Sequence, residues 1–175
     1  MIARGIEKKG WRFLILAFIQ ASLENAVLKL YGNGDFLDLL HQEFKDFKNI
    51  EFCGYTNNPL KAIAEFDVGV FSSYYEAESL PTTVIEYLMM GKPVITTNVG
   101  ECAAMIRDGE GNDAGLIVSI INGIPSVDEL ARAMEKLYKD REYLNNLEDR
   151  SLNAAEKFRM EVCMEQYLKI YEENL

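Results

Sequence analysis

Two carboxylates flank a candidate anion site in the middle of the sequence. Residues 78–86 read ESLPTTVIE, so seven residues separate Glu78 from Glu86, and Pro81, Thr82 and Thr83 lie between them. We expect a helix to begin at this proline, because proline favours the first helical position, where its missing N–H has no partner to lose. The unpaired backbone N–H groups near Thr82 and Thr83, at the positive end of the helix, suit a phosphate.

Glu86 is spaced to act beside that phosphate. It follows Thr82 by four positions and Thr83 by three, so the three side chains share one helix face. One helical turn is about 5 Å, which is where a ribose would lie, and a carboxylate can accept both hydroxyls of its diol. Glu78 precedes the helix, on the side where a sugar would lie. A solvated surface glutamate is the alternative for Glu86, and Glu76 is a rival for the role of Glu78.

Two cations near the start of the chain can neutralise a diphosphate. Arg4 and Lys9 follow a short apolar opening and precede a helix, which places them at the carboxyl edge of a sheet. Arginine binds phosphate as a fork and lysine as a point charge. The alternative is an ordinary polar turn, RGIEKKG. Taken together, the two cations, the helix start and the two acids predict a site for a sugar nucleotide.

These residues depend on strands and helices that alternate along the chain. Apolar and β-branched runs predict strands over residues 26–35, 49–54, 67–73, 92–97 and 114–120. Helices are expected over residues 11–22, 36–47, 60–65, 81–90 and 102–109, and from Ser126 onward, where Ser126 and Glu129 form a capping box. Alternation of this kind predicts an α/β fold with a doubly wound parallel sheet, whose ligands bind at the carboxyl ends of the strands. The chain looks cut near its first strand.

Composition excludes several other classes of protein. A formal net charge of −10 argues against nucleic acid and against an anionic membrane surface as partners. The most apolar run, Phe13–Ala21, is too short to span a bilayer, so we expect no transmembrane segment and a cytoplasmic location. Cys53, Cys102 and Cys163 match no metal-ligand spacing and are expected to be buried free thiols, while His41 is expected on a helix surface. We therefore expect no metal.

The segment ESLPTTVIEYLMMGKPVITTNVGE, residues 78–101, resembles the signature of the retaining glycosyltransferases of family four, which have the GT-B fold. Glu78 and Glu86 match the family's E-x(7)-E motif. Arg4 and Lys9, followed by Gly10, match its Arg-x(4)-Lys-Gly motif. LKLYGNGD and NIEFCGY match the next two strands, and the last helix is similar to the family's closing helix. The resemblance thus covers nearly the whole chain.

The resemblance implies that residues 1–175 form the Rossmann-like, donor-binding C-terminal half, with residues 159–175 as its closing helix, and that an N-terminal acceptor-binding domain is absent. The donor would be a UDP- or GDP-sugar, used without a metal or other cofactor. The full enzyme would transfer the sugar, with retention, to a glycan or lipid-linked acceptor in polysaccharide biosynthesis. A peripheral position of the full enzyme at the inner membrane face is compatible with this role. The isolated half would be nearly inactive. The implied catalytic residues are Glu78, at the sugar, and Arg4 and Lys9, at the diphosphate. The nucleotide would be bound by these two cations, by amides near Leu80, Thr82 and Thr83, by Glu86 at the ribose and by Tyr55 at the base.

The sequence also departs from the family pattern and leaves alternatives open. Ser79 and Leu80 stand where the family has glycines after the first glutamate. A non-catalytic sugar-nucleotide-binding subunit and part of a sugar-nucleotide epimerase both fit the same pattern. A nicotinamide-binding domain fits poorly, because Gly32 and Gly34 do not continue as G-x-G-x-x-G. A receiver-type signalling domain fits worse still, because the sequence has no acidic cluster after the first strand.

Overall fold

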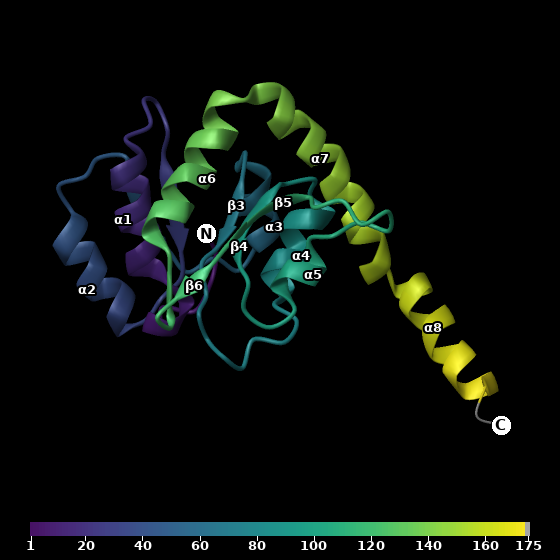
Figure 1. The fold of residues 1–175 in the computed structure, drawn as a ribbon. Helices are drawn as coiled ribbons and strands as arrows, with labels where there is room; N and C mark the ends of the chain where they lie inside the picture. Colours follow the sequence, from purple (N-terminus) through teal and green to yellow (C-terminus); the bar gives the residue numbers. More distant parts are fainter. Residues whose placement is uncertain (174–175) are drawn as a thin grey trace.

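The computed structural model describes residues 1–173 as alternating strands and helices (Figure 1). The strands are β1 (Leu28–Tyr31), β2 (Ile50–Gly54), β3 (Gly69–Phe71), β4 (Val94–Thr97), β5 (Gly115–Val118), β6 (Ile120–Ile121) and β7 (Ile124–Pro125). The helices are α1 (Trp11–Ala21), α2 (Asp35–Phe44), α3 (Pro59–Ala64), α4 (Thr82–Met89), α5 (Cys102–Met105), α6 (Val127–Lys139), α7 (Arg141–Ala155) and α8 (Met160–Glu173), with 3₁₀ turns η1 (Glu7–Lys9) and η2 (Glu156–Phe158). The α/β class expected from the sequence is confirmed.

The first five strands form two parallel groups. β1 pairs with β2, with Leu28 opposite Ile50, and β4 lies between β3 and β5. Parallel neighbours need crossover connections, and α2, α4 and α5 lie within them. The carboxyl ends of strands within each group therefore meet at one edge. This is the edge at which α/β proteins bind ligands.

Residues 1–3 lie between the two groups of strands. Ile2 forms a parallel bridge with Tyr31: the Tyr31 N–H donates to the Met1 carbonyl at 2.9 Å, and the Ala3 N–H donates to the Tyr31 carbonyl at 3.1 Å. On the other side lies Ser72, the residue directly after β3, whose hydroxyl is 3.7 Å from the Met1 sulfur. Residues 1–3 therefore have β1 and β2 on one side and β3, β4 and β5 on the other. The loops after residue 3 and after β3 meet at this switch point.

Alternating residues of the central strands contribute to two separate cores. Val70 and Ile95 belong to a core with α1 and α6, whereas Phe71 and Val94 belong to a core with α4 and α7. Successive side chains of a strand point to opposite faces, so helices cover both faces of the parallel strands. Figure 1 shows α1 beside α6, and the two helices are in contact, as are α4 and α7. This is the doubly wound arrangement.

The segment before α6 differs from the expectation of a helix reached directly from a strand. A hairpin, β6 and β7, intervenes, and its turn residues Asn122 and Gly123 both have positive φ, as a two-residue hairpin turn requires. The expected capping box is only half present. The Ser126 hydroxyl accepts from the Glu129 N–H, but the Glu129 carboxylate accepts from the Ser119 N–H at 2.7 Å instead of the Ser126 N–H. The Ser126 N–H already donates to the Ser119 carbonyl, so Glu129 fastens the hairpin to the helix.

The last helix extends away from the rest of the molecule (Figure 1). α8 has no buried residue, and η2 separates it from α7. The expected closing helix over 159–175 begins one residue later, at Met160, and its last two residues lie outside the described part of the chain. Between residues 1 and 173, no helix combines the length and apolarity that a membrane span needs.

Candidate functional site

Three loops approach one another closely at the carboxyl ends of the central strands. A Cβ on Gly10, whose φ is +78°, would lie 1.9 Å from the Ser72 carbonyl oxygen. A Cβ on Gly100, whose φ is +51°, would lie 1.9 Å from the Glu78 carbonyl oxygen. Both positions need glycine for conformation and for space. The loops after residue 3, after β3 and after β4 are thereby held against one another.

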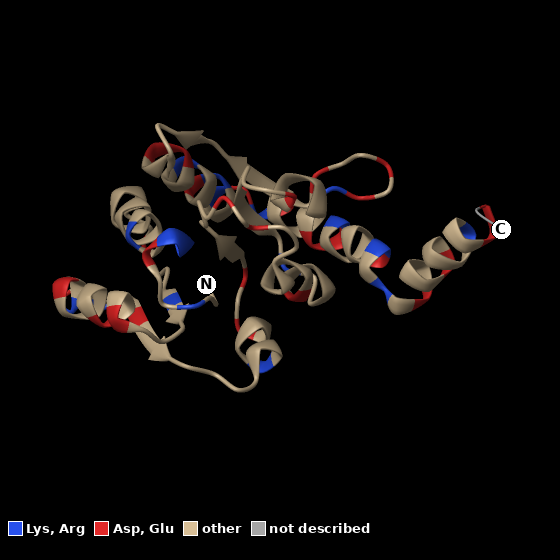
Figure 2. Cartoon of the chain, turned by 90° about the horizontal axis from the view of Figure 1, so that it is seen from below, with Lys and Arg blue, Asp and Glu red and all other residues tan. Residues whose placement is uncertain are grey.

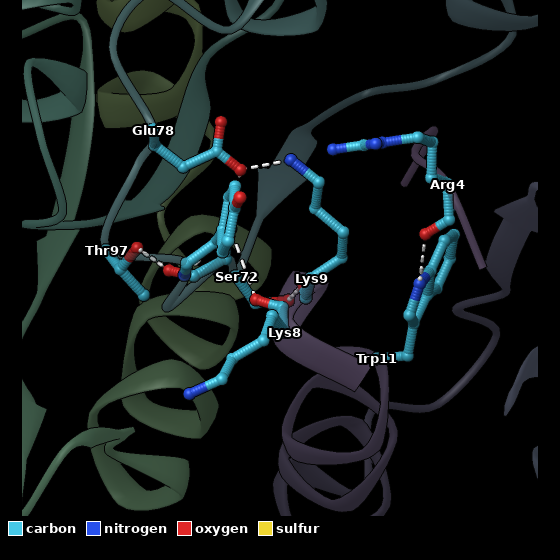
Figure 3. Close-up of polar contacts among 9 residues, drawn as sticks. Arg4, Lys8, Lys9, Trp11, Ser72, Glu78 and Thr97 are labelled. Atoms are coloured by element: carbon cyan, nitrogen blue, oxygen red, sulfur yellow. Dashed lines mark hydrogen bonds and ion pairs between the residues drawn. The ribbon is translucent and has the colours of Figure 1, made fainter. Parts of the chain in front are cut away.

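Lys9 and Glu78 form an ion pair where these loops meet (Figure 3). Only 9% of the Lys9 side chain and 8% of the Glu78 side chain are exposed. The Lys9 ammonium also lies 5.3 Å from the centre of the Phe71 ring and 5.9 Å from that of Tyr75. Two charges removed from water to this extent require each other, because either one alone would be strongly destabilising.

A buried serine contributes a second hydrogen bond to the same carboxylate. The Ser73 hydroxyl donates to Glu78 Oε1 at 2.8 Å, and Ser73 is fully buried. The Thr97 hydroxyl donates to the Ser73 carbonyl, which ties the end of β4 to this loop. Ser72, Ser73 and Thr97 are not among the site residues predicted from the sequence. The available signal was a polar pair directly after the apolar run of β3, at the edge where ligands bind.

Arg4 lies on the other side of the Lys9 side chain. Arg4 is exposed, and Figure 3 shows its guanidinium directed toward the Lys9–Glu78 pair. The Trp11 indole N–H donates to the Arg4 carbonyl at 2.9 Å, so the backbone at Arg4 is fixed while its side chain remains accessible. Figure 2 shows basic segments near the start of the chain in a molecule whose helices carry many acidic residues. Arg4 and Lys9 thus bring two cations to this edge of a chain whose net charge is −10, and Glu78 pairs with one of them.

The start of α4 presents unpaired donors. The helix begins at Thr82, and Pro81 precedes it with an extended ψ of 113°, so the expectation of Pro81 as the first helical residue is wrong by one position. The Val84 N–H donates to the Pro81 carbonyl at 3.0 Å. Within residues 1–173, the N–H groups of Thr82 and Thr83 have no acceptor. They remain available to an anion, and Leu80, which precedes them, is 53% exposed.

Glu86 lies one turn further along α4, without a cation. It is half-buried, and the described residues offer its carboxylate neither an ion pair nor a hydrogen-bond donor. Burial raises the pKa of Glu86 above its ordinary value, because the charged form loses water. A half-buried carboxylate without a protein donor is suited to accept hydrogen bonds from a ligand.

Tyr55 and Glu76 occupy exposed positions. Tyr55 follows β2 and is 73% exposed; the Gly32 N–H donates to the Gly54 carbonyl at 2.9 Å, so the ends of β1 and β2 lie together. Tyr55 makes no hydrogen bond to Lys9 or Glu78 in the part of the chain that the structure describes. Glu76 is exposed, and Lys9 pairs with Glu78 instead. Of the two rival acids, Glu78 is the one integrated into the polar cluster.

The remaining sites expected from the sequence can also be located. All three cysteines are free, as expected. The expected burial is confirmed for Cys102 and is wrong for Cys53 and Cys163, which are partly exposed. His41 lies in α2 and stacks on Phe52 at a ring distance of 4.7 Å. In the part of the chain that the structure describes, His, Cys, Asp and Glu side chains form no group of three suited to a metal. A hollow of about 350 Å³ lies at the amino ends of β1 and β3, away from the polar cluster.

Comparison with known proteins identifies the family. The model of the family described as glycosyl transferases group 1 matches residues 1–140. The chain belongs to this family. This group 1 glycosyltransferase chain is 28% identical, over 156 residues, to the O-antigen biosynthesis glycosyltransferase WbnH of Escherichia coli, covering 89% of this chain and 41% of that protein. It is 25% identical to the poly(ribitol-phosphate) alpha-N-acetylglucosaminyltransferase of Staphylococcus aureus, covering 97% of this chain and 34% of the relative.

Solved structures show the same fold. The structure of Anabaena HepE in complex with UDP and glucose superposes with a TM-score of 0.80 at 19% identity, over 99% of this chain and 47% of that one. A glycosyltransferase from Rickettsia africae gives a TM-score of 0.82 at 18% identity, over 99% and 46% of the two chains. The group 1 chain therefore has the fold of one part of these GT-B proteins, and it spans less than half the length of the relatives and structures named here.

Proposed function

We propose that this chain is the donor-binding half of a retaining glycosyltransferase that uses a nucleoside diphosphate sugar. The observation that carries the proposal is the buried Lys9–Glu78 pair within the loops that meet at the switch point. Membership of the group 1 family supports glycosyl transfer as the reaction class. Anabaena HepE, which has the same fold, was crystallised with UDP and glucose, which favours UDP over GDP as the nucleotide.

In this proposal each polar group has a separate task. Lys9 and Arg4 contact the diphosphate and stabilise the charge that develops on it as the sugar departs, which is the main catalytic contribution. The amides near Leu80, Thr82 and Thr83 add neutral donors to the same phosphates. Glu86 accepts the ribose hydroxyls, Glu78 accepts hydroxyls of the transferred sugar, and Tyr55 faces the base. Arg4, Lys9 and the α4 donors supply the positive charge, so the proposal needs no metal.

The proposal extends to a second half that binds the acceptor. The chain covers 41% of WbnH and 47% of HepE, which leaves more than half of each protein without a counterpart here. α8 supports this view, because large apolar side chains at Met164, Tyr167, Leu168 and Tyr171 are each more than half exposed and recur at helical spacing. A partner domain would cover them. Transfer to a glycan or lipid-linked acceptor belongs to that whole enzyme, and a cytoplasmic location stays a prediction.

A thermal-shift panel with UDP, GDP and ADP, and with their sugars, tests the proposal on this chain. A ligand at about 100 times its dissociation constant stabilises the folded state by about 2.7 kcal/mol, which is a shift of several degrees at this size. We expect one nucleotide to stabilise the wild type and to lose affinity with Glu86→Ala. If no nucleotide shifts the melting temperature, or if Glu86→Ala changes nothing, the proposed function is wrong.

A further inference from the structure

The two oxygens of the Glu78 carboxylate have different surroundings (Figure 3). Oε1 accepts from both the Lys9 ammonium and the Ser73 hydroxyl. Oε2 accepts no hydrogen bond from any residue between 1 and 173. The carboxylate is therefore held by one oxygen, and the other is available to a ligand. Of these two donors only Lys9 carries a positive charge, and a diphosphate would attract it.

The Ser73 hydroxyl is itself fixed by its surroundings. It has one proton, and Glu78 Oε1 at 2.8 Å is a nearer acceptor than the Lys8 carbonyl at 3.2 Å. Its oxygen accepts from the Tyr75 N–H at 3.3 Å, and its backbone carbonyl accepts from the Thr97 hydroxyl. A hydroxyl surrounded in this way keeps its orientation when a neighbouring side chain moves.

We propose that Ser73 is a positioning residue that keeps Glu78 directed at the donor sugar when the diphosphate draws Lys9 toward itself; this rests on the function proposed above. A diphosphate attracts the ammonium more strongly than one carboxylate does, because it carries more negative charge. Oε1 of Glu78, which is nearly buried, then needs a remaining donor, since a buried charge without one is strongly disfavoured. Ser73 supplies that donor without moving, and Oε2 stays aimed at a sugar hydroxyl.

Ser73→Ala tests this role, and Ser72→Ala is a matched control. Ser72 is the neighbouring residue and is also fully buried, but its hydroxyl lies 3.3 Å from the Lys9 carbonyl and 3.2 Å from the Gly10 carbonyl and has no bond to Glu78. Calorimetry gives the dissociation constants of UDP and UDP-glucose, and of GDP and GDP-mannose. We expect Ser73→Ala to raise the constant for the nucleotide sugar, relative to that of its own nucleotide, by about tenfold. Ser72→Ala should leave this ratio at the wild-type value.

The outcomes separate the inference from the function on which it rests. If the wild type binds none of UDP, GDP and ADP, both proposals are overturned. Nucleotide binding with an unchanged ratio in Ser73→Ala, or with equal changes in both serine variants, would overturn only the positioning role. Glu78→Gln should change the ratio at least as much as Ser73→Ala, because it alters the group that touches the sugar. If Ser73→Ala does not fold, Ser73→Cys keeps the shape of the side chain, with a somewhat larger sulfur, and replaces a strong donor by a weak one; the same change of ratio is expected.

Discussion

Replacing Lys9 by methionine separates the electrostatics of the site from its packing. Methionine retains most of the unbranched apolar stem and loses the ammonium. Glu78 then keeps the hydrogen bond from Ser73 but has no counter-charge, while only 8% of its side chain is exposed. Breaking a buried pair in this way typically costs about 3–5 kcal/mol, because an uncompensated charge remains.

The hydrogen bond from Ser73 limits that cost. Hydrogen bonds to charged groups contribute about 1.5–3 kcal/mol, and the Ser73 hydroxyl still donates to Oε1 when the ammonium is gone. We therefore expect Lys9→Met to lower the free energy of unfolding by about 3–4 kcal/mol, in the lower part of the range for a broken buried pair. The corresponding fall in melting temperature is about 6–16 °C.

Urea unfolding measures the free energy, and thermal melting measures the fall in melting temperature, both at pH 7. The control is Lys29→Met, which removes the cation from the Lys29–Glu65 pair; there 29% and 52% of the two side chains are exposed, so the melting temperature should hardly change. Adding Glu78→Gln to Lys9→Met should restore part of the stability at pH 7, because no charge is then left buried. A loss no larger than that of Lys29→Met, or no recovery of stability in the double variant, would refute the reasoning.

Three further changes test other parts of the structure. Burial raises the pKa of Glu86, so the folded protein keeps this proton to higher pH than the unfolded chain does. The contribution of Glu86 to stability therefore falls as the pH rises above 4.5. Thermal melts should show Glu86→Gln gaining stability relative to wild type between pH 4 and pH 7. Gly100→Ala forces a Cβ onto the Glu78 carbonyl and should cost at least about 1–3 kcal/mol in urea unfolding, whereas Gly109→Ala, with open space around its Cβ, should not destabilise the fold. Deleting residues 160–175 should leave the melting temperature within a few degrees of wild type, since α8 has no buried residue; a large loss would show that α8 packs on this half.

Much of the fold was predictable because its signals are local. The apolar runs and their spacing placed every helix from α1 to α5 and each of the first five strands within a few residues. The hairpin has a local signal in Asn122 and Gly123, but its strands β6 and β7 are two residues long, too short for any alternation of apolar residues to predict them. Pro81 was placed one residue too far into α4, an error within the usual uncertainty of a helix boundary.

The sequence by itself determined which chemical groups the candidate site can use. The seven residues between Glu78 and Glu86, and the donors at Thr82 and Thr83, belong to one loop and one helix, so local geometry relates them. Only the tertiary structure decided that Glu78, and not Glu76, meets Lys9, that Ser73 holds the same oxygen, and that Gly10 and Gly100 let the loops approach. The physical reason is that such contacts join segments up to 69 residues apart, and their direction depends on how strands align across the sheet, which no local periodicity specifies.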